Sequence, residues 1–487
     1  MDVGGTGPGI VAIDGGGLHP ALDKFRLIIM MMTLSYLCAL LGVMYTWPSS
    51  TLVLFSSANT TLDRPMTETE VALLGSLSSI SALISTPFSG YLLDTLGRKY
   101  SCMLFALSQV LAWVVVSISY NVVAILTAIF ISGFSGCMML VVPIYVSEIC
   151  QESIRGTMTS GVMVFYGFGM LASYLMGGYL SYEAMIYSCL SMSVLGVLLL
   201  VLLKESPLHL MRKGLEKDAA KVIAYYRSVK VTSKTVEEEI QMLRRAMNPE
   251  LDDLTPEVEK LKPEFKEKQK MSAWKFFKKS RSSRRALVVA LVLYTAAIFQ
   301  GLMVVQVYAE PLFAEAVPTM SPTICSVISA ILTVVSGFIA AFLMEWAGRR
   351  NLMIYASLGA CVSCIVLGTQ IHLHWGPHWI TALFMYLFVI MYTCGAGTVP
   401  FVLVAEIFLP EIRSVASMIA VEWCLICSFV VLFVFNPLVT AVGLGPVFYF
   451  FASVCLLSSI FSFFFVPETK GLTVDVIQNL FASPRKC

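Results

Sequence analysis

Long apolar stretches dominate this chain and restrict the folds that it can adopt. The chain is 57% hydrophobic and 13% charged, and its mean hydropathy is +0.80, outside the range of soluble globular domains. A helix of about 20 apolar residues can cross a bilayer, and it satisfies its backbone hydrogen bonds within the segment. Twelve such stretches lie near residues 27–48, 70–93, 100–119, 122–145, 156–178, 184–203, 286–308, 323–345, 352–371, 379–402, 415–437 and 444–466. The sequence therefore predicts an all-α membrane protein with twelve transmembrane helices.

Three short charged patterns occur twice, in the same order and at nearly the same spacing. The pairs and their offsets are Asp94–Lys99 and Glu345–Arg350 (251 residues), Glu148 with Arg155 and Glu406 with Arg413 (258 residues), and Glu205 and Glu468 (263 residues). A unit of about 250 residues has therefore been doubled, which predicts two six-helix pseudo-repeats. Doubled sets of membrane spans are typical of carriers in which one half rocks against the other around a central site.

The only long hydrophilic stretch, residues 204–285, separates the two six-span halves. The first 26 residues are rich in glycine, carry charges and have no apolar core, so we interpret them as a tail and not as a cleaved signal peptide. The expected organisation is a tail at 1–26, a six-helix bundle at 27–203, a loop with short surface helices at 204–285, a second bundle at 286–466 and a tail at 467–487.

Basic residues predict the orientation in the membrane. With the N-terminus in the cytoplasm, 32 of the 33 Lys and Arg residues fall on the cytoplasmic side, 21 of them in residues 204–285, and Arg64 alone lies outside. The positive-inside rule predicts this asymmetry. Asn59-Thr60-Thr61 then lies in the first outer loop, where Asn59 is an N-glycosylation acceptor. We expect a multi-pass plasma-membrane protein with both termini in the cytoplasm.

Ten charged residues lie at the predicted cytoplasmic ends of helices, at equivalent points of the two repeats. They are Asp94, Arg98, Glu148, Arg155 and Glu205 in the first repeat, and Glu345, Arg349, Glu406, Arg413 and Glu468 in the second. Charges at a membrane boundary often serve only as solubilising caps. Their repetition favours another interpretation, in which two ion-pair clusters form an inner gate. The gate is expected to be formed when the carrier faces out and broken when it faces in.

No motif for an enzyme, a cofactor or ATP is visible. Nearly all of the 13 cysteines lie in predicted spans, where packing is a better interpretation than redox or zinc chemistry. His372, His374 and His378 share an outer loop without a Cys or carboxylate near them in sequence, so no metal site is predicted. The basic run 275–285 directly precedes a span, which indicates an anchor to anionic lipid and not a nucleic-acid site. Without ATP, transport would run downhill or be coupled to an ion.

Several of the charged patterns extend into longer motifs. They are Gly90-x3-Asp94-x2-Gly97-Arg98-Lys99, Pro143-x-Tyr145-x2-Glu148-Ile149, Arg155-Gly156, Glu205-Ser206-Pro207, Gly348-Arg349-Arg350, Pro400-x5-Glu406-Ile407-Phe408 and Pro467-Glu468-Thr469-Lys470-Gly471. With these motifs the chain resembles the sugar-porter branch of the major facilitator superfamily over essentially its full length. The short tails and Tyr45-Thr46-x-Pro48 look most like the insect trehalose and hexose facilitators. The resemblance implies alternating access, with a sugar bound at mid-membrane between the halves.

The predicted solute site departs from that family. Sugar porters usually carry hydrogen-bonding side chains or tryptophan at five positions in spans 5, 7 and 10. At those positions this chain has Met163, Ala297, Ile298, Met303 and Phe401. A sugar needs donors and acceptors around it, because unpaired hydroxyls are costly to desolvate. The candidate solute contacts are Gln300, Gln306, Tyr308, Phe401, Glu422 and Met163.

The expected activity is facilitative transport of a sugar, a hexose or a trehalose-like disaccharide. Proton-coupled sugar porters usually carry an acid in span 1, and none lies in residues 27–48. Uniport is therefore favoured over symport. Two alternatives stay open, namely a carrier of the same fold for a less polar solute, and a transport-dead sugar sensor. Glu422 lies inside span 11, where a charge is expensive, and is either a solute or proton site or paired near the boundary.

Overall fold

The structure is a computed structural model of the whole chain. It describes residues 20–150, 152–247, 280–408, 410–470, 472 and 474–482. Within these ranges, only the backbone is described for residues 20–25, 27, 152–163, 245–247, 405, 410–414, 474–475 and 482. Every regular element in the described part is a helix.

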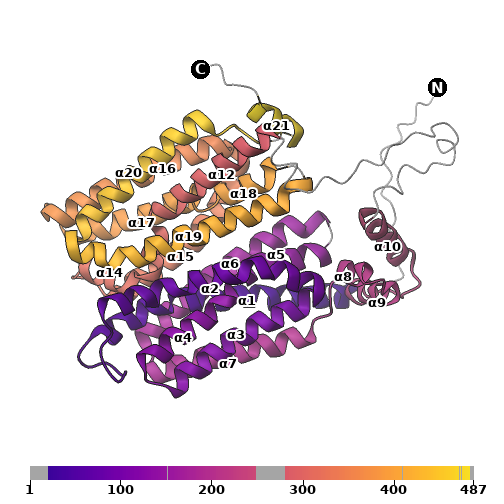
Figure 1. Cartoon of the computed structure of the whole chain (residues 1–487), viewed down its shortest axis with the longest axis horizontal. Helices are drawn as coiled ribbons and strands as arrows, with labels where there is room; N and C mark the ends of the chain where they lie inside the picture. Colours follow the sequence, from indigo (N-terminus) through magenta and orange to yellow (C-terminus); the bar gives the residue numbers. More distant parts are fainter. Residues whose placement is uncertain are drawn as a thin grey trace, which may run out of the picture.

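The first half of the chain forms one bundle of long helices (Figure 1). Its elements are α1 (Pro20–Ser56), α2 (Glu68–Thr95), α3 (Arg98–Ile118), α4 (Val122–Gly133), the 3₁₀ turn η1 (Phe134–Cys137), α5 (Met138–Ile149), α6 (Glu152–Tyr179) and α7 (Tyr182–Leu202). Three shorter helices follow, α8 (Pro207–Arg212), α9 (Glu216–Arg227) and α10 (Lys234–Met247). The stretch predicted as one span at 122–145 is thus divided by η1 into α4 and α5.

The second half forms a matching bundle beside the first (Figure 1). Its elements are α12 (Arg281–Phe299), α13 (Leu302–Val307), α14 (Ala309–Ala316), α15 (Pro322–Ala347), α16 (Arg349–Leu373), α17 (His378–Cys394), α18 (Val399–Ile407), α19 (Pro410–Val442), α20 (Leu444–Phe465) and α21 (Val474–Ala482). Helices α8–α10 and α21 lie at the same end of the molecule. We name this the inner end, following the orientation that the sequence predicts, and name the opposite end, with residues 57–67 and α14, the outer end.

Eleven segments of the described residues are long and apolar enough to cross a membrane. They correspond to eleven of the twelve predicted spans, and the remaining prediction, 156–178, is helix α6. Large apolar side chains remain exposed along these helices, as on α15, where Phe338, Phe342 and Trp346 follow one another at every fourth residue. Such a stripe is the surface that a bilayer would cover.

Small residues allow the long helices to cross closely. A Cβ atom on Gly42 of α1 would lie 2.2 Å from the carbonyl oxygen of Tyr166 in α6, and one on Gly169 would lie 1.9 Å from that of Ala39. Neither position has space for a larger side chain. In the second half, α16 and α20 approach through Gly368 and Gly445. Gly-mediated approach of this kind is typical of helices packed in membranes.

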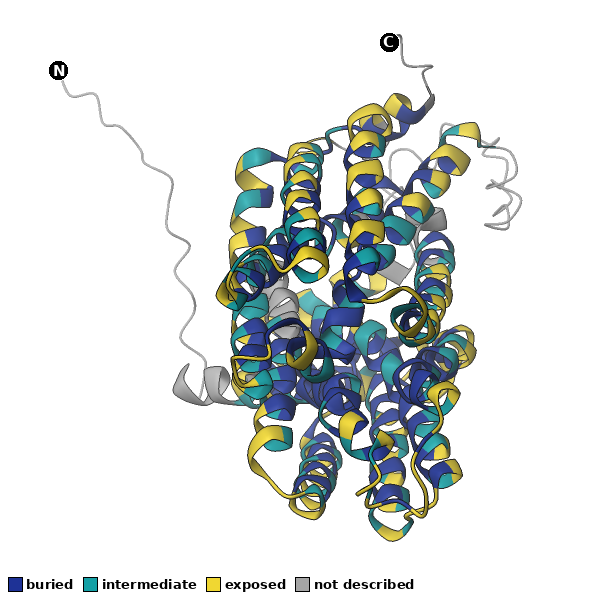
Figure 2. Cartoon of the chain, turned by 90° about the vertical axis from the view of Figure 1, so that its left-hand side faces the viewer, coloured by how far each residue is buried: buried dark blue, intermediate teal, exposed yellow. Residues whose placement is uncertain are grey.

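The two halves are joined at the outer end. Tyr174 of α6 donates a hydrogen bond to the carbonyl oxygen of Gln306 (2.7 Å), and the backbone N–H of Glu310 donates to the Ser49 hydroxyl (2.8 Å). A Cβ atom on Gly178 would lie 2.0 Å from Cγ2 of Thr323 across the same interface. Figure 2, seen from the outer end, shows buried residues around the middle of the molecule and exposed ones on its outer faces and loops. The outer end is therefore closed.

Candidate functional site

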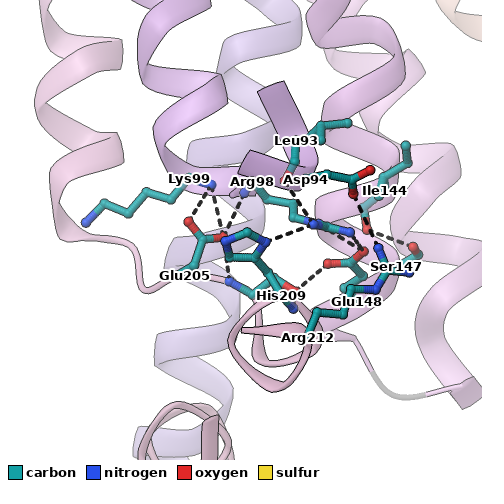
Figure 3. Close-up of polar contacts among 11 residues, drawn as sticks. Leu93, Asp94, Arg98, Lys99, Ile144, Ser147, Glu148, Glu205, His209 and Arg212 are labelled. Atoms are coloured by element: carbon teal, nitrogen blue, oxygen red, sulfur yellow. Dashed lines mark hydrogen bonds and ion pairs between the residues drawn. The ribbon is translucent and has the colours of Figure 1, made fainter. Parts of the chain in front are cut away.

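Arg98 is the centre of a buried polar network at the inner end of the first half (Figure 3). Its guanidinium donates to Oε1 of Glu148 through NH2 (2.7 Å) and Nε (3.1 Å), and through NH1 to the carbonyl oxygen of Leu93 (3.1 Å). The side chains of Arg98 and Glu148 are only 4% and 9% exposed. Because both charges are almost fully buried, each depends on the other, and the pair fixes α3 against α5.

Glu205 supports the tight turn before α3. Its carboxylate accepts hydrogen bonds from the backbone N–H groups of Arg98 (2.8 Å) and Lys99 (3.1 Å), the first of the helix. A carboxylate is stabilised there by the free N–H groups and the helix dipole. Gly97, the residue before, has φ +94°, and a Cβ atom there would lie 2.5 Å from Glu205 Oε2. Glycine is therefore required at this turn.

The second half repeats this network residue by residue. Arg349 donates to Glu406 Oε1 (2.7 Å) and to the carbonyl oxygen of Met344 (3.3 Å), while Glu468 accepts from the backbone N–H groups of Arg349 (2.9 Å) and Arg350 (3.1 Å). The copy is more open to solvent, since the Arg349 and Glu406 side chains are 17% and 27% exposed. The repeat that the sequence predicts is thus also present in the individual hydrogen bonds of the two networks.

A hydroxyl completes each network, and sequence reasoning had assigned it no role. Ser206 donates to Oε2 of Glu148, and Thr469 donates to Oε2 of Glu406 (2.6 Å). Each follows directly after the capping glutamate, so Glu205-Ser206 and Glu468-Thr469 act as equivalent pairs. The sequence indicates this role only through the hydroxyl residue that follows the glutamate in both repeats.

His209 distinguishes the first network from the second. Its ring lies on α8, is almost fully buried, and has Nδ1 3.2 Å from NH1 of Arg98. Since a guanidinium only donates hydrogen bonds, Nδ1 accepts and the ring is neutral with its hydrogen on Nε2. Burial lowers the pKa of His209, and the Arg98 charge contributes in the same direction although Glu205 opposes it. In the second half the equivalent position, four residues after the capping glutamate, is Leu472.

Acid is expected to weaken the first network through His209. A lowered pKa in the folded state means that the unfolded chain binds the proton more tightly, so stability is complete above the unfolded pKa of about 6.5 and is lost as pH falls through the folded pKa. The apparent Tm of purified protein, measured by thermal melting between neutral and mildly acidic pH, should therefore fall faster than that of His209→Gln, which keeps an acceptor but cannot titrate. Parallel curves for the two proteins would contradict this role.

The structure brings together six of the ten predicted charges: Arg98, Glu148, Glu205, Arg349, Glu406 and Glu468. Asp94 makes only an exposed contact with Arg212 (3.4 Å), and Glu345 is exposed with no ion pair among the described residues. The side chains of Arg155 and Arg413 lie outside the described part of the chain. Each Arg–Glu pair joins two helices of the same half, Arg98–Glu148 in the first and Arg349–Glu406 in the second. Both pairs are formed in this structure, in which the outer end is closed. The inner gate stays a prediction.

The break in span 7 places Gln300 at the centre of the second half. Helix α12 ends at Phe299, Gly301 has φ +97°, and α13 begins at Leu302. A glycine is needed at this φ, and a Cβ atom would also collide with the ring of Phe451, 2.6 Å away. The Gln300 side chain is 0% exposed, and neither its oxygen nor its nitrogen has a hydrogen-bond partner among the described residues. This amide can both donate and accept without moving.

The other predicted solute contacts have different surroundings. Tyr308 is buried at the outer closure, where it donates to the carbonyl oxygen of Leu432 (3.0 Å). The side chain of Gln306 is partly buried, and its backbone carbonyl accepts the bond from Tyr174. Phe401 is 47% exposed and packs edge-on against Tyr294, with ring centres 5.0 Å apart. The Met163 side chain lies outside the described residues. Of the three side chains described here, that of Phe401 is the most exposed.

Glu422, the sixth candidate, lies on α19, the helix of the second half that packs on α2 of the first. Its side chain is partly buried, and its Oε1 atom has no hydrogen-bond partner among the described residues.

Tyrosines that the sequence analysis did not select lie between the halves at mid-membrane. The rings of Tyr45 (α1) and Tyr166 (α6) are 6.5 Å apart, and neither hydroxyl has a hydrogen bond to a described residue. A Cβ atom on Gly136 would lie 3.2 Å from the Tyr45 hydroxyl, which places that hydroxyl beside η1. Because the spans are apolar on all faces, the sequence pattern does not show which of their tyrosines face the other half.

Two helical bundles of membrane spans, each with an Arg–Glu network at its inner end and joined around a polar centre, define a membrane carrier of the major facilitator fold. Residues 28–481 match the model of the sugar (and other) transporter family. This chain belongs to that family, and it is a transporter and not an enzyme.

Individual relatives agree with this assignment. The chain is 25% identical to the facilitated trehalose transporter Tret1 of Polypedilum vanderplanki over 89% of this chain and 83% of that protein. It is also 25% identical to Tret1 of Apis mellifera ligustica, over 96% and 92%. Among solved structures, the inward open xylose transporter XylE from E. coli matches with a TM-score of 0.75 at 20% identity, covering 94% of this chain and 99% of XylE. The structural match supports the fold.

Proposed function

We propose that this protein is a facilitative carrier of a hexose or a trehalose-like sugar. The observation that carries the proposal is the amide of Gln300, which is fully buried and whose donor and acceptor have no partner in the part of the chain that the structure describes. Leaving such a group unpaired costs roughly 1–3 kcal/mol. Sugar hydroxyls both donate and accept, so a bound sugar would satisfy the amide. The free hydroxyls of Tyr45 and Tyr166 offer further partners across the interface between the halves.

Alternating access in this proposal moves the two halves as rigid bodies. Each half has its own inner network, and the hydrogen bonds between the halves that involve described residues lie at the outer end. Opening the outer end would break these hydrogen bonds. The two Arg–Glu pairs lie within single halves and would stay formed, while a gate at the inner end is proposed to close in exchange. We propose uniport because α1 carries no acid between Arg26 and its end at Ser56.

Gln300→Leu tests the solute site. The change keeps the volume but removes both hydrogen-bonding groups, so each lost bond to a sugar hydroxyl should weaken binding by about 0.5–1.5 kcal/mol, up to roughly tenfold in KM. Without sugar, the variant should be at least as stable as wild type, because the unsatisfied amide is gone. Uptake kinetics of labelled glucose and trehalose, with the apparent Tm of purified protein, measure both effects.

Gln109→Leu is the matched control. Gln109 is also buried, but its amide donates to the carbonyl oxygen of Leu40 (2.8 Å) within the first half. Its loss should lower the apparent Tm and leave KM unchanged. Unaltered KM for both sugars in Gln300→Leu would show that Gln300 is a structural residue and not a solute contact.

We propose the plasma membrane as the location, with both termini in the cytoplasm. Asn59 is exposed at the outer end, in the loop between α1 and α2. In cells, the protein should therefore run as a glycosylated band that shifts on glycosidase treatment and is absent in Asn59→Gln. Cleavage of the 204–285 loop by protease added to intact cells would contradict the orientation.

A further inference from the structure

Helices α5 and α18 are short half-helices that carry the network glutamates, Glu148 and Glu406. Helix α5 is separated from α4 by the 3₁₀ turn η1, and α18 is separated from α17 by residues 395–398. Each half-helix ends at the isoleucine that directly follows its glutamate, Ile149 in α5 and Ile407 in α18. A helix leaves its last carbonyl oxygens without partners inside the helix. These two isoleucine carbonyls therefore need hydrogen-bond donors from elsewhere in the fold.

A helix at the inner end supplies that donor in each half. In the first half, Arg227 at the end of α9 donates through NH2 to the carbonyl oxygen of Ile149 (3.1 Å). In the second half, the side-chain amide of Gln478 on α21 donates to the carbonyl oxygen of Ile407. The Arg227 side chain is 13% exposed, and Gln478 is buried. Both hydrogen bonds are thus shielded from water, where they are stronger than exposed ones.

The same two helices are tied to the first span of their own half. NH1 of Arg26 on α1 donates to the carbonyl oxygen of Tyr225 near the end of α9 (3.0 Å). NH1 of Arg285 on α12 donates to the carbonyl oxygen of Phe481 near the end of α21 (3.1 Å). Helix α9 packs on α1, and α21 packs on both α12 and α18. Each helix therefore connects the first span of a half to the half-helix that carries the network glutamate.

The contacts repeat on the spans but not on the two inner helices. Arg26 and Arg285 are 259 residues apart, and Ile149 and Ile407 are 258 apart, which are offsets of the sequence repeat. In α9 the donor follows the accepting carbonyl by two residues, whereas in α21 it precedes that carbonyl by three. Two helices that differ in register but reach the same two points indicate that each half needs a connection between these points.

We propose that α9 and α21 act as matched braces, and that Arg227 and Gln478 are positioning residues for transport. By fixing the residue next to each network glutamate, they hold the two glutamates against their arginines while a half moves. The inference rests on the proposed alternating access, in which each half moves as a rigid body. Without its brace, α5 or α18 would open independently of its half, and the motion of that half would no longer reach the glutamate at the inner end.

Hydrogen–deuterium exchange of the purified full-length protein tests each brace without any sugar. Gln478→Leu keeps the volume but removes the donor, so the backbone amides of α18 should exchange roughly twofold to tenfold faster, while those of α5 keep the wild-type rate. Arg227→Leu should give the reverse pattern. Arg227→Lys, which keeps a donor for Ile149 and a positive charge for Glu239, should exchange like wild type in α5.

Gln370→Leu is the matched control, because the Gln370 amide also donates to a backbone carbonyl, that of Gly376, but at the outer end. It should leave exchange in α5 and α18 unchanged. Uptake of labelled glucose and trehalose gives the second measurement. In Gln478→Leu the maximal rate should fall by about twofold or more, while KM stays unchanged, because the brace acts on a conformational step and lies away from Gln300.

Wild-type exchange in α18 of Gln478→Leu would overturn the brace. Faster exchange together with wild-type uptake would overturn the positioning role. If the wild-type protein takes up neither sugar, the proposed sugar carrier fails and the positioning role fails with it. The exchange rates of α5 and α18, which require no sugar, then decide by themselves whether the two braces exist.

Discussion

Replacing Arg98 by alanine should cause the largest loss of stability among single substitutions in the two inner networks. The change leaves Glu148 buried, charged and without its partner, which costs about 3–5 kcal/mol. It also removes the donor to Leu93 and the contact with His209. We expect a lower apparent Tm, reduced surface expression and loss of sugar uptake, measured together in cells and on purified protein.

The equivalent substitution in the second half provides a comparison, because its network is less buried. Arg349→Ala removes the equivalent residue from a more exposed network, so its effect should be clearly smaller. Adding Glu148→Gln to Arg98→Ala removes the unpaired charge and should recover part of the lost stability. Lys221→Ala, which breaks an exposed pair with Asp218, should have no measurable effect. Wild-type stability in Arg98→Ala would rule out an ion pair that fixes the first half.

Gly178→Leu should prevent the outer end from closing. Gly178 faces Thr323 of the other half at a distance where even a Cβ atom collides, and overpacking of this kind costs about 1–3 kcal/mol. The closed state would lose that amount relative to the open one, and about 1.4 kcal/mol is a tenfold shift in population. Transport should fall, and a cysteine introduced at Ser49 in the outer contact should react faster with a membrane-impermeant thiol reagent applied from outside.

Tyr179→Leu is the control for this experiment. Tyr179 is the neighbouring residue, but its side chain is 71% exposed. It should transport like wild type. If Gly178→Leu also transports normally and its Ser49 cysteine stays unreactive, then the contact between Gly178 and Thr323 does not limit opening of the carrier.

Periodic and repeated features of the sequence predicted most of the fold. Apolar stretches of sufficient length located the spans, because a bilayer requires helices there. Doubled motifs located Arg98 with Glu148 and Arg349 with Glu406, because the charges were rare and their spacing was constant. The sequence predicted one cluster in each half, but it could not show which charges of a cluster pair with one another, and Asp94 and Glu345 lie outside the two networks. Partner choice depends on helix packing, which an offset between repeats does not encode.

The centre of the protein was harder to predict. Gln300 was predicted as a solute contact, and the structure places it where α12 ends, fully buried and without a hydrogen-bond partner among the described residues. Tyr308 and Gln306 also lay in the right span, but the outer closure uses the Tyr308 hydroxyl and the Gln306 carbonyl. Tyr45, noted only as part of a motif, and Tyr166 were not predicted to lie between the halves, because aromatic residues are common in spans and only the packing shows which face they share.

The distance between the inner networks and the mid-membrane residues allows the two to vary independently. Gln300 lies nineteen residues from Arg281 at the inner end, roughly 28 Å along the helix, and substitutions that far apart add without coupling. A carrier built in this way tolerates changes in solute preference that do not affect its folding. That separation accounts for a chain in which the charged motifs match sugar porters while Ala297, Ile298 and Met303 do not, and it makes these positions the ones to vary when redirecting the carrier to a new solute.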